Sequence, residues 1–298
     1  MPGRYVVALG GNALIPPGGR GTAEEQVRTV ESAMNRLGPL AAAGAEVVIT
    51  HGNGPQVGNL LLKNELAADE VPPMPLDWCV AQTQATIGLA IQGALEWELR
   101  QRHSDRMVVV VLTRVLVDPL DPRRLQFTKP IGRRLSPEEA AAKADDRHRY
   151  AAQPDGCWRR VVPSPEPVAV VEEAEIRQLM EGGAVVVAAG GGGVPVEQGE
   201  QGRYFGIEAV IDKDLTASLL ARRVGAEALV ILTEARGVAV NYGQPGERML
   251  ARVTPSIVRG FQAAGHFAEG SMGPKVEAAL RFVEGGGGRA AISSLEDA

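Results

Sequence analysis

The chain has 298 residues, of which 45% are hydrophobic and 22% are charged, a composition typical of globular proteins. Its formal net charge of −5 argues against a nucleic-acid-binding protein, because such proteins usually carry a basic excess. No apolar run reaches the roughly 18 residues of a membrane helix, no signal peptide precedes the first strand-like segment, and the two cysteines are too few for a disulfide framework. We therefore expect a cytoplasmic protein that binds neither nucleic acid nor membranes.

The first elements alternate between strand and helix. Tyr5–Leu9 is a short β-branched run that predicts a buried strand, and Glu46–Thr50 predicts a second one. Between them, Thr22 and Glu25 have the spacing of a capping box, which predicts the start of a helix. Gly44 is a natural end for that helix.

The middle of the chain contains a change of character. A helix is expected after residues 51–55, and a long helical segment runs from Pro75 to about His103. Met107–Val115 predicts a single apolar strand. From about 116 to 163 the hydrophobic periodicity is lost, and Pro, Arg and Asp become frequent. We interpret this segment as an excursion from the main sheet.

Regular alternation then resumes to the end of the chain. The expected elements are a helix at Glu172–Met180, a strand at Ala184–Ala189, a helix at Asp214–Arg223, a strand at Ala228–Thr233 and a helix beginning at Pro274. Strands that alternate with helices at this spacing predict a mostly parallel sheet covered on both faces.

Three glycine-rich turns follow predicted strands: Gly10–Gly11, Gly52–Gly54 and Gly190–Gly193. Ligands of open parallel sheets bind at the carboxyl ends of strands, and glycine lets backbone N–H groups approach an anion. Tight turns alone would also explain glycine, but three such turns favour a phosphate or carboxylate ligand. The chain has no P-loop motif, and Pro195 occupies the third glycine position of a dinucleotide-binding loop.

Lysine is rare, with five occurrences among 31 basic residues. Three of the five lie in motif-like turns, at Lys129, Lys213 and Lys275. Lys213 precedes Asp214 at the start of a predicted helix, directly after the strand-like segment Ala209–Ile211. Acidic residues suit a helix N-terminus, so a solvated cap is one interpretation. Phosphoryl transfer, which needs compact positive charges, is the other.

These motifs together resemble the carbamate kinases of the amino-acid-kinase superfamily. Most other members of that superfamily carry a lysine before the first glycine pair, whereas this chain has Ala8, as carbamate kinases do. The matching segments occur in order along nearly the whole chain: residues 7–14, 51–58, 75–77, 128–132, 158–165, 190–196, 208–215 and 270–275.

The resemblance implies an α/β fold, a three-layer αβα sandwich around a mainly parallel open sheet, with a small protruding subdomain. Residues 1–222 would form the lobe that binds carbamate and dimerises, and residues 223–298 would form the nucleotide-binding lobe. The excursion at about 116–163 would be the protruding subdomain, a mobile arm that brings Lys129 over the active site.

The resemblance also implies a phosphotransferase reaction, ADP + carbamoyl phosphate ⇌ ATP + carbamate, with Mg²⁺ accompanying the nucleotide and no metal ligands from the protein. Beyond these substrates, the implied partner would be a second copy of the chain, in a homodimer. The implied catalytic residues are Lys129, Lys213, Asp214 and Lys275. The implied substrate-binding residues are Gly10, Gly11, Asn12, Gly52, Asn53 and Gly54. The implied nucleotide-binding residues are Gly191, Lys213, Thr233, Asn241, Tyr242, Met272 and Lys275.

One segment departs from the family pattern. Residues 234–239 carry Arg236 where the family has an aspartate and Ala239 where it has a tyrosine. Because this segment lies in the expected nucleotide lobe, contacts to the base or ribose would change. A kinase acting on another small acid and a non-catalytic nucleotide-binding protein are the alternatives. Ala8 argues against the first and the retained lysines against the second.

Overall fold

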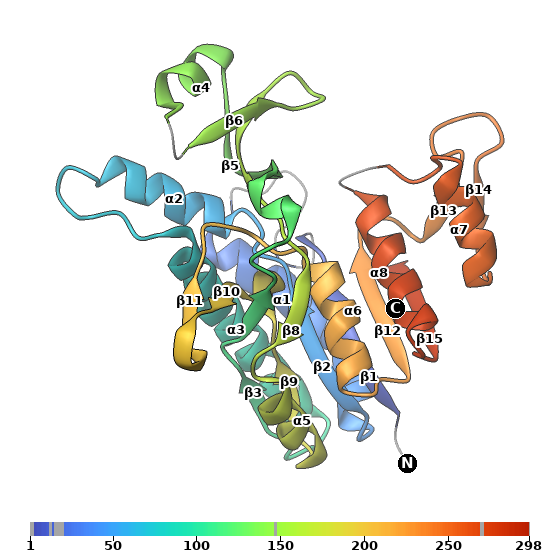
Figure 1. Ribbon diagram of the computed structural model, residues 1–298. Coiled ribbons are helices and arrows are strands. Elements are labelled where there is room, and N and C mark those ends of the chain that lie inside the picture. Colours follow the sequence, from blue (N-terminus) through green and yellow to red (C-terminus); the bar gives the residue numbers. More distant parts are fainter. Residues whose placement is uncertain (1–2, 12–13, 15–20, 146–147, 269–270, 298) are drawn as a thin grey trace.

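The structure is a computed structural model that describes residues 3–11, 14, 21–145, 148–268 and 271–297. A six-stranded sheet forms its centre, in the order β15-β12-β1-β2-β9-β3, and every neighbouring pair is parallel (Figure 1). Its strands are β1 (Arg4–Leu9), β2 (Glu46–His51), β3 (Val108–Val110), β9 (Val185–Val187), β12 (Ala228–Thr233) and β15 (Arg289–Ser294).

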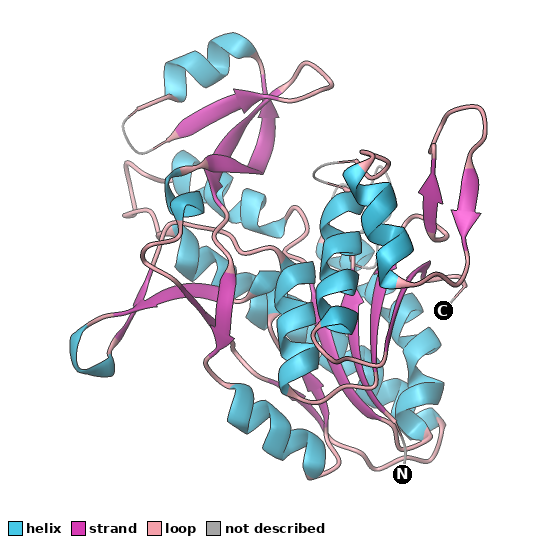
Figure 2. Cartoon of the chain, turned by 45° about the vertical axis from the view of Figure 1, so that its right-hand side comes forward, coloured by secondary structure: helices cyan, strands magenta, loops and turns pink. Residues whose placement is uncertain are grey.

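Helices cover both faces of this sheet (Figure 2). Successive residues of a strand point to opposite faces, so Val7 and Leu9 of β1 pack into one core, while Val6 and Ala8 pack into the other. The first core includes α1 (Ala23–Ala42) and α3 (Leu76–Gln101); the second includes α5 (Glu173–Glu181), α6 (Lys213–Arg223) and α8 (Met272–Glu284). The predicted three-layer α/β sandwich is confirmed.

The first helix begins where the capping box predicts. The Thr22 side chain accepts a hydrogen bond from the Glu25 N–H, and the Glu25 carboxylate accepts one from the Thr22 N–H. Gly44, just after the helix, has a φ of 87°, which glycine adopts without strain.

Residues 127–145 and 148–163, which we call the arm, contain a separate three-stranded antiparallel sheet and protrude beyond the carboxyl ends of the central strands (Figure 1). The arm consists of β5 (Phe127–Leu135), α4 (Pro137–Lys143), β6 (Arg149–Ala152) and β7 (Trp158–Pro163), and a 3₁₀ turn at Pro122–Leu125 precedes it. It rests on α2 (Gln56–Leu66), where a Cβ added at Gly58 would meet the Gly132 Cα at 2.8 Å. The two backbones therefore touch.

The prediction of one strand at Met107–Val115 is wrong. The segment divides into β3 and β4 (Arg114–Val117), which belong to different sheets. Between them, the Thr113 N–H donates to Gln84 Oε1 and the Thr113 carbonyl accepts from Gln84 Nε2, so a side chain of α3 satisfies this backbone. The second sheet has the order β11-β10-β4-β8, with β8 (Pro167–Val170), β10 (Val194–Gln198) and β11 (Tyr204–Gly206).

Two further expectations need correction. Ala209–Ile211 is no strand but a buried irregular segment, in which the Val210 N–H donates to the Pro163 carbonyl of the arm. Helix α8 begins at Met272, so Pro274 is its third residue rather than its first. Beside α8 lie α7 (Pro255–Ala263) and a hairpin of β13 (Val238–Val240) and β14 (Arg248–Leu250).

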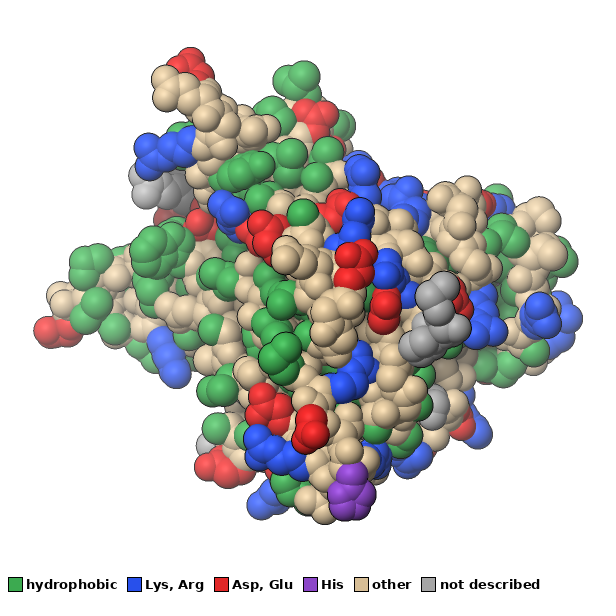
Figure 3. Space-filling view, turned by 90° about the horizontal axis from the view of Figure 1, so that it is seen from below, with side chains coloured by type: hydrophobic (Ala, Val, Ile, Leu, Met, Phe, Trp, Pro, Cys, Tyr) green, Lys and Arg blue, Asp and Glu red, His purple; other side chains and the backbone are tan. Residues whose placement is uncertain are grey.

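In the described part of the chain, no helix has both the length and the apolar character needed to cross a membrane. The face seen in Figure 3 carries acidic and basic side chains interspersed with hydrophobic ones rather than a patch of one sign.

Candidate active site

The three glycine-rich turns lie side by side at the carboxyl ends of strands in the central sheet. They follow β1, β2 and β9, and these three strands are neighbours in the sheet. Together with the arm and the starts of α6 and α8, they line a cavity of about 280 Å³. Its lining contains nine of the residues predicted to act in the site: Gly11, Gly52, Asn53, Gly54, Lys129, Gly191, Lys213, Asp214 and Lys275.

Gly191 illustrates why a side chain is excluded from these turns. Its φ is 66°, and a Cβ built there would lie 1.8 Å from Asn53 Oδ1. That oxygen also accepts a hydrogen bond of 2.7 Å from the Thr83 hydroxyl. The glycine run therefore holds the Asn53 amide in place by close backbone approach.

The backbone N–H groups of the turns are not all available to a ligand. The Gly10 N–H donates to the Leu232 carbonyl at 2.9 Å, and the Gly52 N–H donates to the Leu9 carbonyl at 3.2 Å. Both hydrogen bonds continue the backbone pairing of neighbouring strands past the last strand residue. In the described part of the chain, the N–H groups of Gly11, Asn53, Gly54 and Gly191 have no protein acceptor and line the cavity, so they are among the donors that an anion would find.

Two lysines converge on one buried carboxylate. Asp214 is only 3% exposed, and its Oδ1 accepts from Lys213 Nζ. Its Oδ2 lies 3.4 Å from Lys275 Nζ, which also lies 3.3 Å from the Ser271 carbonyl oxygen. Asp214 is therefore not a solvated cap. It orients two ammonium groups that come from different helices.

The third lysine reaches the cavity from the arm. Lys129 Nζ lies 2.8 Å from Asp212 Oδ2. Asp212 is the N-cap of α6, and its Oδ1 accepts from the Asp214 N–H at 2.9 Å. Burial raises the pKa of the Asp212 carboxyl, but the Lys129 ammonium, the Lys213 charge and the hydrogen bond from the Asp214 N–H together outweigh this, and the net pKa lies below the ordinary value. Asp212 therefore stays ionised and ties the arm to α6.

His51 lies at the end of β2, beneath the site. It is 1% exposed, and its Nδ1 lies 2.8 Å from the Gly52 carbonyl oxygen. Burial, together with the nearby Lys213 charge, lowers the pKa of His51 from 6.5 to about 4, although the hydrogen bond to the Gly52 carbonyl acts in the opposite direction. The imidazole is neutral at physiological pH, which suits a residue that orders the loop.

Several predicted residues lie away from the cavity. Gly10 is buried below it, and Asn12 falls outside the described residues. The remaining four predicted nucleotide contacts do not line the cavity in the described structure: Thr233, Asn241, Tyr242 and Met272. Thr233 ends β12, Asn241 and Tyr242 follow β13, and Met272 begins α8.

The segment that departs from the family pattern lies in the same region. Arg236 is at the surface and pairs with Asp297 at 3.2 Å. Ala239 is 7% exposed and pairs with Met249 in the β13–β14 hairpin, so it faces protein rather than open solvent. A tyrosine at this position would have to fit a buried space.

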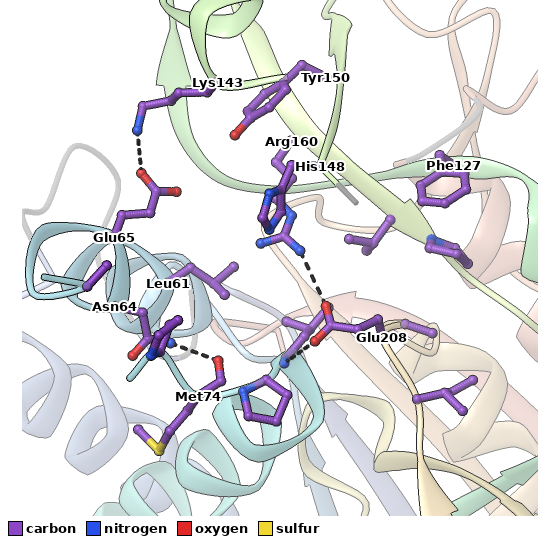
Figure 4. A pocket seen from close by; sticks show the side chains of 18 of the residues that line it. Leu61, Asn64, Glu65, Met74, Phe127, Lys143, His148, Tyr150, Arg160 and Glu208 are labelled. Atoms are coloured by element: carbon purple, nitrogen blue, oxygen red, sulfur yellow. Dashed lines mark hydrogen bonds and ion pairs between the residues drawn. The ribbon is translucent and has the colours of Figure 1, made fainter. Parts of the chain in front are cut away.

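Sequence reasoning missed Arg159 and the role of Asp212 in the cavity. It also gave no sign of a second, larger cavity of about 940 Å³ between the arm and the body. Two ion pairs cross this cavity, as Figure 4 shows: Lys143 to Glu65 at 2.7 Å and Arg160 to Glu208 at 3.3 Å. They hold the arm against α2 and the segment before α6.

Comparisons with known proteins decide the family. A model of the amino acid kinase family matches residues 3–294. The carbamate kinase of Pyrococcus horikoshii is 45% identical over 100% of this chain and 96% of its own length, and carbamate kinase 1 of Enterococcus faecium is 43% identical over 100% and 95%. This chain belongs to the amino acid kinase family, among its carbamate kinases.

Solved structures of carbamate kinases agree with this assignment. The carbamate kinase of Giardia lamblia, solved with bound AMP-PNP, superposes with a TM-score of 0.92 and 38% identity over 100% of this chain and 94% of that one. As a carbamate kinase, the chain is a phosphotransferase with a nucleotide as one substrate. The predicted family, fold and enzyme class are confirmed.

Proposed function

We propose that this carbamate kinase catalyses ADP + carbamoyl phosphate ⇌ ATP + carbamate in the small cavity at the strand ends. The observation that carries the proposal is the convergence of Lys129, Lys213 and Lys275 on that cavity from three separate elements. A cavity of this size suits a small metabolite together with the end of a nucleotide. Carbamate, released in this direction, decomposes to ammonia and bicarbonate.

The chemistry needs positioning and charge rather than a base. The bond between phosphorus and the carbamoyl oxygen breaks while a terminal oxygen of ADP bonds to phosphorus. The electron pair leaves with carbamate, and charge balances without a proton transfer. Lys213 and Lys275 neutralise the transferring group and the nucleotide phosphates, while the free N–H groups of Gly11, Asn53 and Gly54 hold oxygens of the acyl phosphate.

The residues present fit Mg²⁺ that arrives with the nucleotide. Both oxygens of Asp214 already contact lysines, and the oxygens of Asp212 contact Lys129 and the start of α6. In the described parts of the chain, no group of three or more metal-binding side chains was found. Nucleotide phosphates commonly supply ligands to this ion, so MgADP is the substrate we propose.

The activity assay is direct. Purified protein with MgADP and carbamoyl phosphate should form ATP, measured by coupling to hexokinase and glucose-6-phosphate dehydrogenase. Acetyl phosphate and aspartyl phosphate serve as competing donors. ATP formed from one of these and not from carbamoyl phosphate would favour the other small-acid kinase. Nucleotide binding without any phosphoryl transfer would favour a regulatory protein.

We also propose that the enzyme works as a homodimer in the cytoplasm. Three large hydrophobic side chains of α3 are exposed on one face: Trp78 (62%), Leu89 (71%) and Trp97 (57%). They recur at helical spacing, and exposed apolar patches of this kind commonly mark protein interfaces. Both cysteines are free, as in a reducing compartment.

A charge placed in this stripe tests the dimer. Leu89→Glu should convert a dimer to a monomer, as measured by size-exclusion chromatography with light scattering. Leu120→Glu is the matched control, because Leu120 is equally hydrophobic and 86% exposed but lies outside α3. A wild-type monomer, or a Leu89→Glu dimer, would show that this face is not the interface.

A further inference from the structure

A fourth cation, Arg159 of β7, lies in the active-site cavity. Its Nε and Nη2 both donate to the Gly132 carbonyl, at 3.2 and 2.9 Å. The three lysines of the cavity each pair with an aspartate. Within the described chain, Arg159 forms no ion pair, because its acidic neighbour Asp155 pairs with Arg134 at 2.6 Å. Arg159 therefore brings a positive charge without a bonded counter-charge.

The next residue along the strand provides a contrast. Consecutive residues of a strand point to opposite faces, and Arg160 points into the larger cavity, where it pairs with Glu208 (Figure 4). The two arginines of β7 thus have different surroundings. Arg160 joins the arm to the body, and Arg159 faces the site.

Burial makes this lone charge unfavourable without an anion. Desolvation lowers the pKa of Arg159, yet a guanidinium stays charged at any physiological pH. A partly buried charge without a counter-ion is unfavourable, and a single carbonyl uses only part of the donor fork. The remaining N–H groups and the charge suit an anionic oxygen.

The position of Arg159 indicates which substrate it serves. The Gly132 turn that it holds lies against Gly58, in the helix that directly follows the Gly52–Gly54 loop. Lys275 and Ser271, in contrast, enter the cavity at the start of α8. We propose that Arg159 binds the anionic oxygens of the acyl phosphate, and so determines KM for carbamoyl phosphate rather than for ADP. This assignment rests on the function proposed above.

Steady-state kinetics of Arg159→Met and Arg159→Lys test the assignment. Loss of a charge-assisted hydrogen bond should raise KM for carbamoyl phosphate at least about tenfold in Arg159→Met, with KM for ADP within about twofold of wild type. Arg159→Lys keeps the charge but loses the fork, so its KM should be intermediate. Added guanidinium at millimolar concentration should restore part of the Arg159→Met activity. Arg133→Met is the control, since Arg133 is on the arm, 43% exposed in its side chain, paired with Glu139 and outside the cavity.

The outcomes separate binding from support of the fold. Equal rises in both KM values, or a lower kcat alone without guanidinium rescue, would show that Arg159 only props the Gly132 turn, and would overturn the proposal. If Arg159→Met does not fold, as judged by its thermal transition, wild-type KM for carbamoyl phosphate in Arg159→Lys would overturn it. A wild-type protein that forms no ATP would overturn the proposed function itself, and this assignment with it.

Discussion

Replacing Lys213 by arginine keeps the formal charge but changes the shape and position of the charged group. The Lys213 stem passes over Gly52, with Cδ and Cε at 3.4 and 3.5 Å from the place of a Gly52 Cβ, and its Nζ reaches the buried Asp214 carboxylate. A planar guanidinium is wider than an ammonium and does not fit the space that the Lys213 ammonium occupies. A hydrogen bond to a charged group contributes roughly 1.5–3 kcal/mol. A loss of about 2.7 kcal/mol from the transition state is a hundredfold in rate, in the range seen for groups that stabilise developing charge.

We therefore expect kcat of Lys213→Arg to fall about a hundredfold in the coupled ATP-forming assay. The thermal transition should remain close to wild type. Lys63→Arg is the control, because Lys63 is exposed on α2 and far from the cavity lining. A kcat within about threefold of wild type would mean that Lys213 is only a residue of the helix start, and the charge argument would fail.

Two other substitutions probe the framework of the site. In His51→Gln, stability should depend less on pH: the wild-type His51 pKa is lowered to about 4 from 6.5, so the unfolded chain takes up the proton first as pH falls, and stability is lost. Urea unfolding at pH 7 and 4.5 should show a fall that is smaller by roughly 2–3 kcal/mol in the variant, and equal falls would contradict the buried neutral imidazole. In Gly58→Ala, the new Cβ would lie 2.8 Å from the Gly132 Cα and displace the arm. KM for carbamoyl phosphate should rise about tenfold or more with ADP binding retained, and wild-type kinetics would show that this contact is dispensable.

The central sheet could be predicted because its signals are local. Buried parallel strands appear in sequence as short β-branched runs, and Ala228–Thr233 was located to the residue in this way. The split of Met107–Val115 could not be predicted, because both halves are apolar. The turn between them depends on Gln84, which is distant in sequence and bonds to Thr113 from α3.

The candidate site was predictable as a set of motifs but not as a set of contacts. Strand-end glycines and rare lysines pointed to the cavity without any knowledge of strand order. Which N–H groups remain free depends on that order, because the Gly10 and Gly52 donors are used by neighbouring strands. The sequence alone therefore could not show which backbone N–H groups are free. The four predicted nucleotide residues outside the cavity came from the resemblance alone, and their roles stay predictions.

The position of Arg159 in the cavity also could not be predicted from the sequence. Arginine supplies most of the basic residues in this chain, so one more arginine carries no signal of its own. Strand alternation predicts that Arg159 and Arg160 point in opposite directions, but it does not say which one faces the substrate. That choice depends on the register of β7 against β5 and on the contact between Gly132 and Gly58. Glu208 pairs with Arg160, and no carboxylate in the described chain pairs with Arg159. The packing of the arm therefore leaves the Arg159 charge available for the anionic substrate proposed above.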